Sequence, residues 1–441
     1  MFILQHLLSK LKSEFDFSKK GKERGIWFIY TLMAIIIPFT SSKTSNLLRC
    51  LETLFGFTDI SSRRFYTFMA SSKIPWKQLW FRLWKLIPKP LTDGRLILVL
   101  DDTINPKTGK KIFGCYNFFD HAAKQNQSKF PWAQNIVHVG LLKRIKGRWA
   151  SLPLTFRFYH LAKELAKVKT GKRPVEFQSK MEQATEMICE IYTQFQQSVI
   201  VVTDSWFGNN GLWKPLRQQI GQKINLVSHM RINANLFDFP SVTRKKVRGR
   251  PRKYGKKLGN PATLAEKIKG LAKEYNIDLY GKNRTITAHA QVVMLKTLKC
   301  PVKVVWVFRK TQWVALFSTD LSLSVEQIIE YYGARWKIES GFKELKHDLG
   351  SAETQTRNQN AVTNHLQFCM MASTVTWIYA SQLEKIPNRR HSVKGRTHYA
   401  FSDVRRLMSE AICDDDFNKV FPIPQKTSIK SLIATMLRMA A

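Results

Sequence analysis

The chain has 441 residues, and its 71 Lys and Arg stand against 32 Asp and Glu, which gives a formal net charge of +39. Hydrophobic residues make up 44% of the chain and charged residues 23%, so a disordered basic tail is excluded and a packed core in two or three domains is expected. A charge of this size predicts a polyanionic partner. Nucleic acid is the favoured candidate, and an anionic membrane surface is the alternative. The Cys residues form no CxxC pair, which excludes a zinc ribbon or disulfide scaffold and is typical of reduced cytosolic thiols.

The first 90 residues are predicted to be helical, because apolar side chains recur at spacings of three and four. Within them the apolar run Ile26–Pro38 resembles part of a membrane span. It holds only 13 residues and ends in Pro, whereas a span needs about 20. We therefore expect a core helix there, and a linker at the Pro- and Gly-containing stretch Pro88–Gly94.

After this linker the apolar pattern becomes that of buried strands. Leu96–Leu100 is a continuous apolar run, typical of a strand buried on both faces. The expected order is three antiparallel strands, then helix, strand, helix and strand, which makes an α/β core covered on both faces. The segments after Leu100 are the strands Asn135–Arg144, Arg148–Tyr159, Ser198–Thr203 and Ile224–Met230, and the helices Val175–Gln197 and Asn210–Ile220.

Residues 232–324 interrupt this pattern. They open with a basic stretch that contains Gly and Pro and end in the β-rich segment Val302–Thr319, so we interpret them as an insertion. Helices are predicted from Val325 to about Leu349 and from Ala361 to Leu383. The residues from Pro387 on form a basic tail in which no element is predicted.

Acidic residues end two of the predicted buried strands. Asp101 and Asp102 follow the first apolar run, and Asp204 follows Thr203. Functional side chains of α/β proteins gather beyond the carboxyl ends of strands, although each Asp could instead cap the next turn. Successive side chains of a strand point to opposite faces, so only one of Asp101 and Asp102 should serve the site. The apolar run before them does not indicate which.

The helix predicted from Val325 on carries a carboxylate among cations. Its four notable residues are Tyr332, Arg335, Glu339 and Lys346. Their separations of three, four and seven place them on one helical face. The opposite face carries the apolar residues Ile338, Phe342 and Leu345. A carboxylate can ligate a metal ion, and the cations and the hydroxyl can bind phosphate oxygens, although ion pairs on a surface helix would give the same pattern.

This Y-x2-R-x3-E-x6-K pattern resembles the YREK signature of DDE transposases from bacterial insertion sequences, in particular the insertion sequence four group. The strand ends VLDDT and VVTDSWFGN resemble the two acidic motifs of the same family. The two Asp motifs and the YREK-like pattern occur in the family's order, with a β-rich insertion before the Glu. Together they cover roughly residues 91–383.

The resemblance implies an RNase H-like fold, with a mixed sheet flanked by helices, in which three catalytic carboxylates bind two Mg²⁺ ions, with Mn²⁺ as a substitute. These carboxylates would be Asp102, Asp204 and Glu339. The choice of Asp102 over Asp101 rests on the family pattern, which places Thr after the first catalytic Asp. DNA phosphates near the cleaved end would be contacted by Tyr332, Arg335 and Lys346.

The resemblance also implies cut-and-paste transposition, in which the element's ends are hydrolysed and a freed 3′-OH is transferred to target DNA. The enzyme would act as a homodimer that holds two ends, in the cytoplasm and associated with the nucleoid when bound to DNA. No GxxxxGK[ST] motif occurs, so ATP is not expected, and neither is a membrane. The rival interpretations are an RNase H-like nuclease without strand transfer and a catalytically inactive, transposase-derived DNA-binding protein.

Five parts of the chain are expected on these grounds. Two of them, 91–231 and 325–385, would form the RNase H-like core, the second with the Glu helix. The others would be a helical N-terminal DNA-binding region, the basic and β-rich insertion and a basic C-terminal region, at 1–90, 232–324 and 386–441.

Two features of the insertion are further candidates for DNA binding. The block Arg244–Lys257 is rich in Lys and Arg and contains no acid. Its centre resembles an AT-hook core that fits a narrow minor groove, although a solvated basic loop would attract phosphates without reading sequence. The three arginines of that core are Arg248, Arg250 and Arg252. Trp313 is a candidate platform for a flipped base, as in relatives, although a Trp in a β-segment is equally suited to a core.

Overall fold

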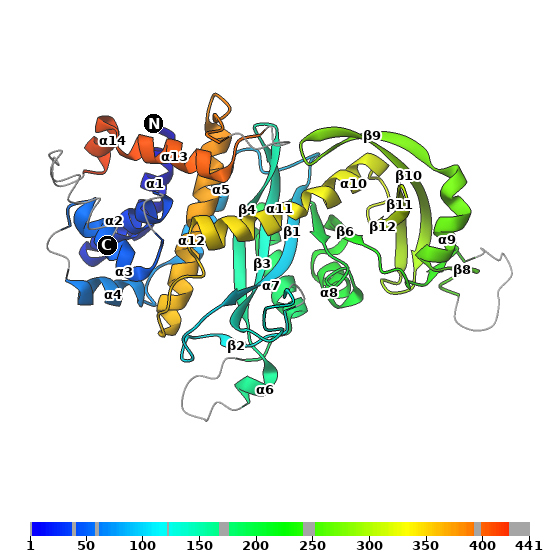
Figure 1. The fold of residues 1–441 in the computed structure, drawn as a ribbon, viewed down its shortest axis with the longest axis horizontal. Coiled ribbons are helices and arrows are strands. Elements are labelled where there is room, and N and C mark those ends of the chain that lie inside the picture. Colours follow the sequence, from blue (N-terminus) through cyan, green and yellow to red (C-terminus); the bar gives the residue numbers. More distant parts are fainter. Residues whose placement is uncertain are drawn as a thin grey trace.

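The computed structural model of the chain describes residues 2–37, 41–57, 61–120, 123–166, 176–240, 252–391 and 398–422. A mixed twelve-stranded sheet runs through the centre and the insertion, with helices on both sides (Figure 1). The N-terminal helices lie at one end of this sheet and the insertion at the other (Figure 1). The sheet therefore joins the predicted core and the predicted insertion into one continuous layer.

Five strands form the core of the sheet, in the order β4-β3-β1-β5-β6. β1 pairs antiparallel with β3, which pairs antiparallel with β4, whereas β1, β5 and β6 are parallel. This mixed α/β arrangement agrees with the RNase H-like fold that was expected. The strands are β1 (Leu96–Pro106), β3 (Trp132–Ile145), β4 (Arg148–Tyr159), β5 (Val199–Thr203) and β6 (Ile224–His229), with the short β2 (Cys115–Asn117) beside β3.

Burial explains why these segments are strands. The first five residues of β1 and all of β5 are buried, as expected for strands covered on both faces. The turn between β3 and β4 has positive φ at Lys146 and Gly147, which suits a tight hairpin. Helices of the core begin with side-chain caps at Ser179 and Asn209. These helices are α7 (Lys180–Phe195) and α8 (Asn210–Ile220), and a short α6 (Ala162–Leu165) precedes them.

The insertion adds further strands to the same sheet. β12 pairs antiparallel with β6, so the insertion continues the core sheet edge to edge. Its strands begin well before the β-rich segment that the sequence predicts. The elements are β7 (Leu236–Phe237), β8 (Lys257–Gly259), α9 (Pro261–Ile268), β9 (Lys273–Leu279), β10 (Lys282–Leu295), β11 (Cys300–Arg309) and β12 (Gln312–Ser318).

The helix predicted from Val325 to Leu349 is interrupted. α10 (Val325–Ala334) ends before Arg335, α11 (Trp336–Lys343) follows, and Glu344–Asp348 form a π-helical turn. Arg335 keeps helical dihedral angles, φ −50° and ψ −37°, so the chain continues in nearly the same direction. The segment is therefore helical, as predicted, but it is not one uninterrupted α-helix.

The N-terminal and C-terminal helices pack together around α12 (Gln359–Gln382), which separates them from β4 (Figure 1). The expected core helix at Ile26–Pro38 is present as α2, with Phe28, Ile29 and Leu32 fully buried. Within the described residues, no helix is both long and apolar enough to cross a membrane. The N-terminal helices are α1 (Phe2–Lys12), α2 (Lys19–Ile36), α3 (Thr44–Thr53), α4 (Ser62–Met69) and α5 (Trp76–Lys85).

The basic tail contains two helices that the sequence did not predict, α13 (Phe401–Ile412) and α14 (Asp415–Val420). Arg405 of α13 donates hydrogen bonds to the backbone oxygens of Ile35 and Ile36 at the end of α2. α13 therefore completes the helical layer around α12.

Candidate active site

The two acids at the end of the buried run of β1 point to opposite sides of the sheet. Asp101 Oδ2 accepts a hydrogen bond from Arg335 Nη1 at 3.0 Å. Asp102 Oδ2 instead accepts from Lys180 Nζ at 2.8 Å and from Asn135 Nδ2 at 2.9 Å. Asp101 thus faces the helix pair α10–α11, and Asp102 faces the start of α7.

Asp204 lies at the carboxyl end of β5 in a tightly fixed turn. Its Oδ1 accepts hydrogen bonds from the backbone N–H groups of Trp206 and Phe207, both at 3.0 Å. Ser228 Oγ donates to the backbone oxygen of Asp204 at 2.7 Å. A Cβ at Gly208 would lie 2.2 Å from Ser228 Oγ, so only glycine fits there. The turn therefore holds the Asp204 carboxylate in one place.

Arg335 joins Asp101 to the Glu helix. Its Nη2 donates to Glu339 Oε1 at 3.0 Å, while its Nη1 holds Asp101. The Arg335 residue is only 7% exposed, and its guanidinium carbon lies 5.7 Å from the ring centroid of Tyr332 and 5.5 Å from that of Trp336. Arg335 was expected at the DNA surface. It is instead a largely buried counter-ion between two carboxylates.

The electrostatics of the carboxylates link all three. Burial raises the pKa of Asp101 to about 7, with Arg335 opposing this rise and the Asp204 charge adding to it. Burial also raises the pKa of Glu339, again with Arg335 lowering it and Asp204 raising it. Asp204 is therefore near enough to repel both carboxylates. On the other face of β1, burial raises the pKa of Tyr159, and the charge of Asp102 adds to that rise.

The sequence favoured Asp102 as the partner of Asp204 and Glu339, and the structure brings Asp101 together with them instead. The reason is the strand pleat, which turns neighbouring side chains to opposite faces. Asp101 lies opposite His138 of the antiparallel strand β3, while Asp102 lies opposite Val137. The uniformly apolar run before the two acids carries no information on this choice.

Carboxylate oxygens are the ligands that Mg²⁺ prefers, so the donor chemistry of Asp101, Asp204 and Glu339 fits a divalent cation. Their mutual repulsion is also what a bound cation would relieve. Across the described part of the chain, however, no three Asp, Glu, His or Cys side chains are arranged to hold a metal ion as they stand. In this arrangement the Arg335 guanidinium is the cation between Asp101 and Glu339.

The other two signature residues lie on the same side of β1. Lys346 Nζ donates to Thr103 Oγ1 at 2.7 Å and to the backbone oxygen of Ile104 at 2.8 Å. Burial lowers the pKa of Lys346 to about 8. Tyr332 is half-buried and its ring lies 6.2 Å from the ring of His229. Thr103 and Asp101 are two residues apart and therefore share one face of β1, the face on which Lys346 and Arg335 lie.

His229 and Lys180 are site residues that the sequence did not single out. His229 ends β6, and burial together with Arg335 lowers its pKa, while Asp204 opposes this shift. The available signal was its position at the end of a predicted strand. Lys180 opens α7, and no spacing in the sequence connects it with Asp102.

The structure describes only some of the predicted DNA-binding residues of the insertion. Arg248 and Arg250 are outside the described residues, and Arg252 is exposed. Trp313 is half-buried in β12 opposite Phe308 of β11. Trp306 is fully buried, and its Nε1 donates to the backbone oxygen of Pro261 at 3.0 Å, so it belongs to the core of the insertion.

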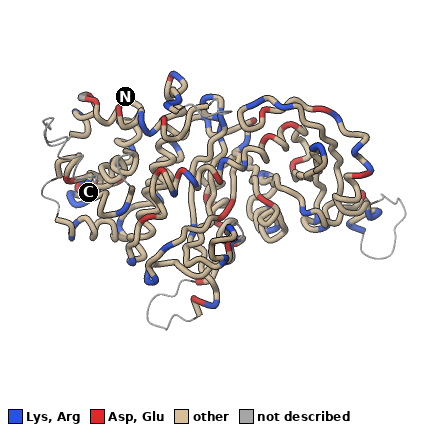
Figure 2. The backbone as a smooth tube through the Cα atoms, viewed as in Figure 1, with Lys and Arg blue, Asp and Glu red and all other residues tan. Residues whose placement is uncertain are grey.

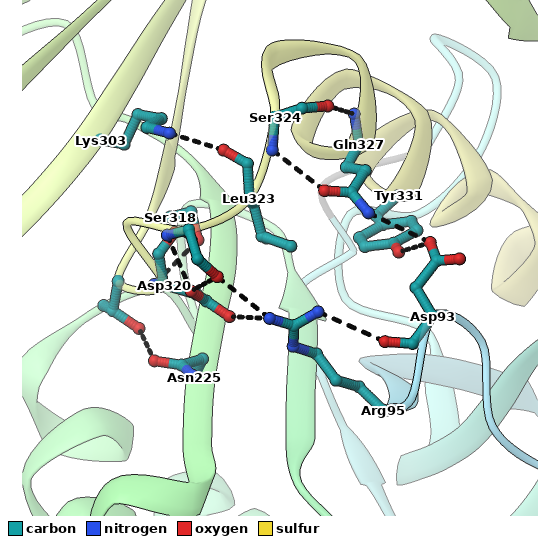
Figure 3. A network of polar contacts seen from close by, with 12 residues as sticks. Asp93, Arg95, Asn225, Lys303, Ser318, Asp320, Leu323, Ser324, Gln327 and Tyr331 are labelled. Carbon is teal, nitrogen blue, oxygen red and sulfur yellow. Dashed lines mark hydrogen bonds and ion pairs between the residues drawn. The ribbon is translucent and has the colours of Figure 1, made fainter.

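A polar network ties the start of β1 to the helix that carries the signature residues (Figure 3). Asp93 accepts hydrogen bonds from the Tyr331 hydroxyl and from Gln327 of α10. Arg95 pairs with Asp320, in the loop before α10, at 3.0 Å. Because Asp93 and Arg95 precede β1 directly, this network fixes α10 relative to the strand that carries Asp101.

An RNase H-like sheet with one acid within a central strand, a second just after the neighbouring strand and a carboxylate on a covering helix defines a class of enzymes that act on nucleic acid. The family model described as DDE superfamily endonuclease matches residues 38–289, more than half of the chain. The chain belongs to this superfamily, whose members act on DNA and generally use divalent metal ions.

A second family model, described as "Archaeal putative transposase ISC1217", matches residues 289–382. This stretch contains all four residues of the YREK-like signature. Comparison with curated proteins gives no match. The two family matches together support a DDE transposase or nuclease, and the insertion sequence four group stays a prediction.

Proposed function

We propose that the chain is a DNA transposase that cuts the ends of a mobile element and joins them to target DNA, with Asp101, Asp204 and Glu339 as its catalytic carboxylates. The observation that carries this proposal is the contact of Arg335 with both Asp101 and Glu339, with Asp204 close enough to raise the pKa of both acids. These acids come from β1, from the turn after β5 and from α11.

The chemistry needs no covalent intermediate on the protein. Divalent ions held by the three carboxylates would activate the attacking oxygen and stabilise the leaving oxygen of an in-line displacement at phosphorus. The turn at Asp204 and the pair with Arg335 hold these carboxylates in orientation before substrate arrives. Tyr332, Arg335 and Lys346 would meet the DNA phosphates when the bound strand replaces their present protein partners.

DNA binding outside the site is supported by the distribution of charge. Lys and Arg occur on all parts of the described backbone (Figure 2). A hollow between α2 and α4 is lined by basic side chains around Trp27 and Tyr66, which supports a DNA-binding role for the proposed region 1–90. Its basic residues are Lys20, Arg24, Arg63, Arg64 and Lys73. We retain the proposed division of the chain at residues 90, 231, 324 and 385.

Strand transfer, a homodimer that holds two ends, and Mg²⁺ as the natural ion are the finer parts of the proposal. The rival is an RNase H-like nuclease that hydrolyses DNA without joining it. The experiment uses DNA that carries the inverted repeats flanking the gene, with Mg²⁺ and a labelled 3′ end. If the chain is a transposase, the amount of joined product should increase with time. Hydrolysis products alone would favour the nuclease. An Asp204→Asn variant that still nicks with Mg²⁺ would overturn both.

A further inference from the structure

The strand beside β1 places a histidine next to Asp101. His138 of β3 lies directly opposite Asp101 in the antiparallel register. Side chains of such a pair leave the same face of the sheet, with their Cβ atoms about 5 Å apart. The His138 ring packs on Phe342 of α11, with centroids 5.5 Å apart, so it lies under the helix that carries Glu339. His138 is therefore on the same side of the sheet as the proposed catalytic acids.

The His138 ring has unused hydrogen-bonding groups. Neither of its nitrogens has a hydrogen-bond partner among the described residues, and the residue is only 2% exposed. Buried polar groups of native proteins are nearly always paired, so each exception needs a reason. Burial also disfavours the charged ring, and a neutral imidazole carries one N–H donor and one acceptor. His138 therefore keeps one donor and one acceptor unpaired beside Asp101.

A serine of the next strand lies close to the same ring. Ser151 of β4 is buried, and its Oγ also has no partner within the described part of the chain. A Cβ at Gly140 would lie 2.6 Å from Ser151 Oγ and 3.3 Å from His138 Cε1, so both side chains use the space that this glycine leaves open. The pairing of β3 with β4 shifts register between Val139 and Gly140, and such bulges re-aim the side chains beside them. Gly140 and the bulge thus bring the serine hydroxyl to the imidazole.

The two oxygens of Asp101 are held by different kinds of donor. Oδ1 accepts from the backbone N–H of Asp102 at 2.9 Å. Oδ2 accepts from Arg335 Nη1 at 3.0 Å. If Asp101 is a metal ligand, as the proposed function has it, the metal ion and the Arg335 guanidinium compete for the same carboxylate. An uncharged donor has no such conflict, because it can hold the carboxylate without replacing the cation.

We propose that His138 is a positioning residue, which donates a ring N–H to the Asp101 carboxylate in the metal-bound state, when Arg335 no longer pairs with it. The Ser151 hydroxyl donates to the other ring nitrogen, and this bond leaves the proton on the nitrogen that serves Asp101. Carboxylates that bind metal ions are commonly oriented by such outer partners. The inference rests on the proposed function, because that function makes Asp101 a ligand.

The first test measures binding of Mn²⁺ by electron paramagnetic resonance, without DNA and without turnover. His138→Leu replaces the ring by an apolar side chain of similar size and should weaken Mn²⁺ binding about 10- to 100-fold, the usual effect of losing an outer partner. In EDTA the same variant should melt at a temperature no lower than that of the wild type, because two unpaired buried nitrogens are gone. His138→Gln keeps an N–H donor and should retain most of the Mn²⁺ affinity.

The serine provides a second test with little risk to the fold. Ser151→Ala removes one hydroxyl and should lower the Mn²⁺ affinity severalfold, because the tautomer of His138 is no longer fixed. Combined with His138→Leu it should cause no further loss, since the hydroxyl acts only through the ring. Ser373→Ala is the matched control, because Ser373 of α12 is also buried with an Oγ that has no partner among the described residues. It should leave the Mn²⁺ affinity unchanged.

The Asp101→Asn variant separates this inference from the proposed function. Loss of Mn²⁺ affinity in Asp101→Asn, with normal affinity in His138→Leu and Ser151→Ala, would reject the positioning role alone. Equal losses in His138→Leu and His138→Gln, with lower melting temperatures in EDTA, would show that the ring serves only packing. If His138→Leu does not fold, normal affinity in Ser151→Ala overturns the role by itself. Normal affinity in Asp101→Asn would instead reject the carboxylate assignment of the proposed function.

Discussion

The side chains of Asp101 and Asp102 are adjacent in sequence and have different electrostatic surroundings. Asp101 is paired with Arg335 and repelled by Asp204, whereas Asp102 is paired with Lys180 and supported by Asn135. Asp102 lies on the face of β1 opposite Glu339 and is therefore poorly placed to share a metal ion with it. Substituting each of the two residues in turn therefore tests which one takes part in cleavage.

We predict that Asp101→Asn, Asp204→Asn and Glu339→Gln each reduce metal-dependent DNA cleavage by several orders of magnitude, because residues that act as one unit are not additive. Each change keeps the side chain's size and removes its charge, so folding should persist. Asp102→Asn should retain cleavage chemistry. The measurement is a single-turnover nicking assay with Mg²⁺, with circular dichroism as the folding check.

The opposite outcome has an equally clear meaning. Loss of cleavage in Asp102→Asn with retention in Asp101→Asn would move the ligand by one residue, to the position that the family pattern favours. Normal cleavage by Glu339→Gln would remove the basis of the carboxylate assignment.

Arg335 is predicted to stabilise the metal-free protein. Arg335→Met leaves Asp101 and Glu339 without their shared cation, and breaking such a pair should cost about 1–3 kcal/mol after allowance for the partial exposure of Glu339. Thermal denaturation in EDTA should show a lower midpoint, and added Mg²⁺ should recover more stability in the variant than in the wild type. Arg335→Lys keeps the positive charge and is the control, so its melting temperature in EDTA should fall less than that of Arg335→Met. Equal midpoints for all three proteins in EDTA would contradict this role.

Lys107 gives a prediction on pH. It is 6% exposed, its Nζ donates to the backbone oxygens of Ala352 and Thr354, and burial lowers its pKa to about 8. Between this value and the unfolded value near 10.5 the unfolded chain binds more protons, so stability rises with pH across that window. Lys107→Met should reduce the slope of the unfolding free energy against pH by up to about 1.4 kcal/mol per pH unit. Urea denaturation at several pH values measures it, and an unchanged slope would contradict the lowered pKa.

Among the elements, α10 and β1 are linked at the N-terminal end of the strand, next to Leu96. Asp93 and Arg95 hold α10 and the loop before it, as Figure 3 shows, and α10 continues through Arg335 into the helix that carries Glu339. The close approach of α10 to β9 adds a second constraint, since a Cβ at Gly333 would lie 2.7 Å from Leu279 Cδ2. The helix register relative to β1 is therefore set outside the site.

Tyr331→Phe should accordingly affect the reaction from a distance. The change removes the hydroxyl that donates to Asp93, at a cost of about 1 kcal/mol in stability. Cleavage measured well below the melting temperature should fall severalfold, because the Glu339 carboxylate is less firmly placed, while DNA affinity stays constant. Glu410→Gln, which removes an exposed ion pair with Arg406 on α13, is the control. Normal cleavage in a destabilised Tyr331→Phe would show that the network serves the fold alone.

The elements were largely predictable from the sequence, and the side-chain arrangement was not. β4 and α8 have the predicted bounds, because apolar patterns and turn residues mark them locally. The face of Asp101 could not be predicted, since a strand buried on both sides shows no alternation. The interruption at Arg335 was also hidden, because Arg335 keeps helical dihedral angles and the spacing of apolar residues does not reveal the break.

At the scale of the whole molecule, the excess of positive charge is spread along the chain and not confined to the site (Figure 2). Such a distribution favours binding to the DNA backbone over a long stretch, with strong dependence on salt. The insertion extends the sheet away from the site, and the described end of the basic block, residues 252–257, runs into β8 at its far end (Figure 1). Binding through this block would therefore reach DNA at a distance from the cleaved phosphate.

The basic block gives a prediction on salt and sequence together. Replacing Arg248, Arg250 and Arg252 with Ala should reduce the slope of log affinity against log salt by about 0.9 for each DNA phosphate that the protein no longer neutralises. An AT-hook would in addition lose more affinity on A·T-rich duplexes, because arginine is favoured in a narrow minor groove. The matched control removes three exposed lysines elsewhere in the insertion, Lys267, Lys269 and Lys273. Binding titrations at several salt concentrations, on A·T-rich and G·C-rich duplexes, separate the two roles. An equal loss on both duplexes would leave sequence-blind attraction of phosphates as the function of the block, and a slope unchanged by the three arginine substitutions would remove it from the DNA interface.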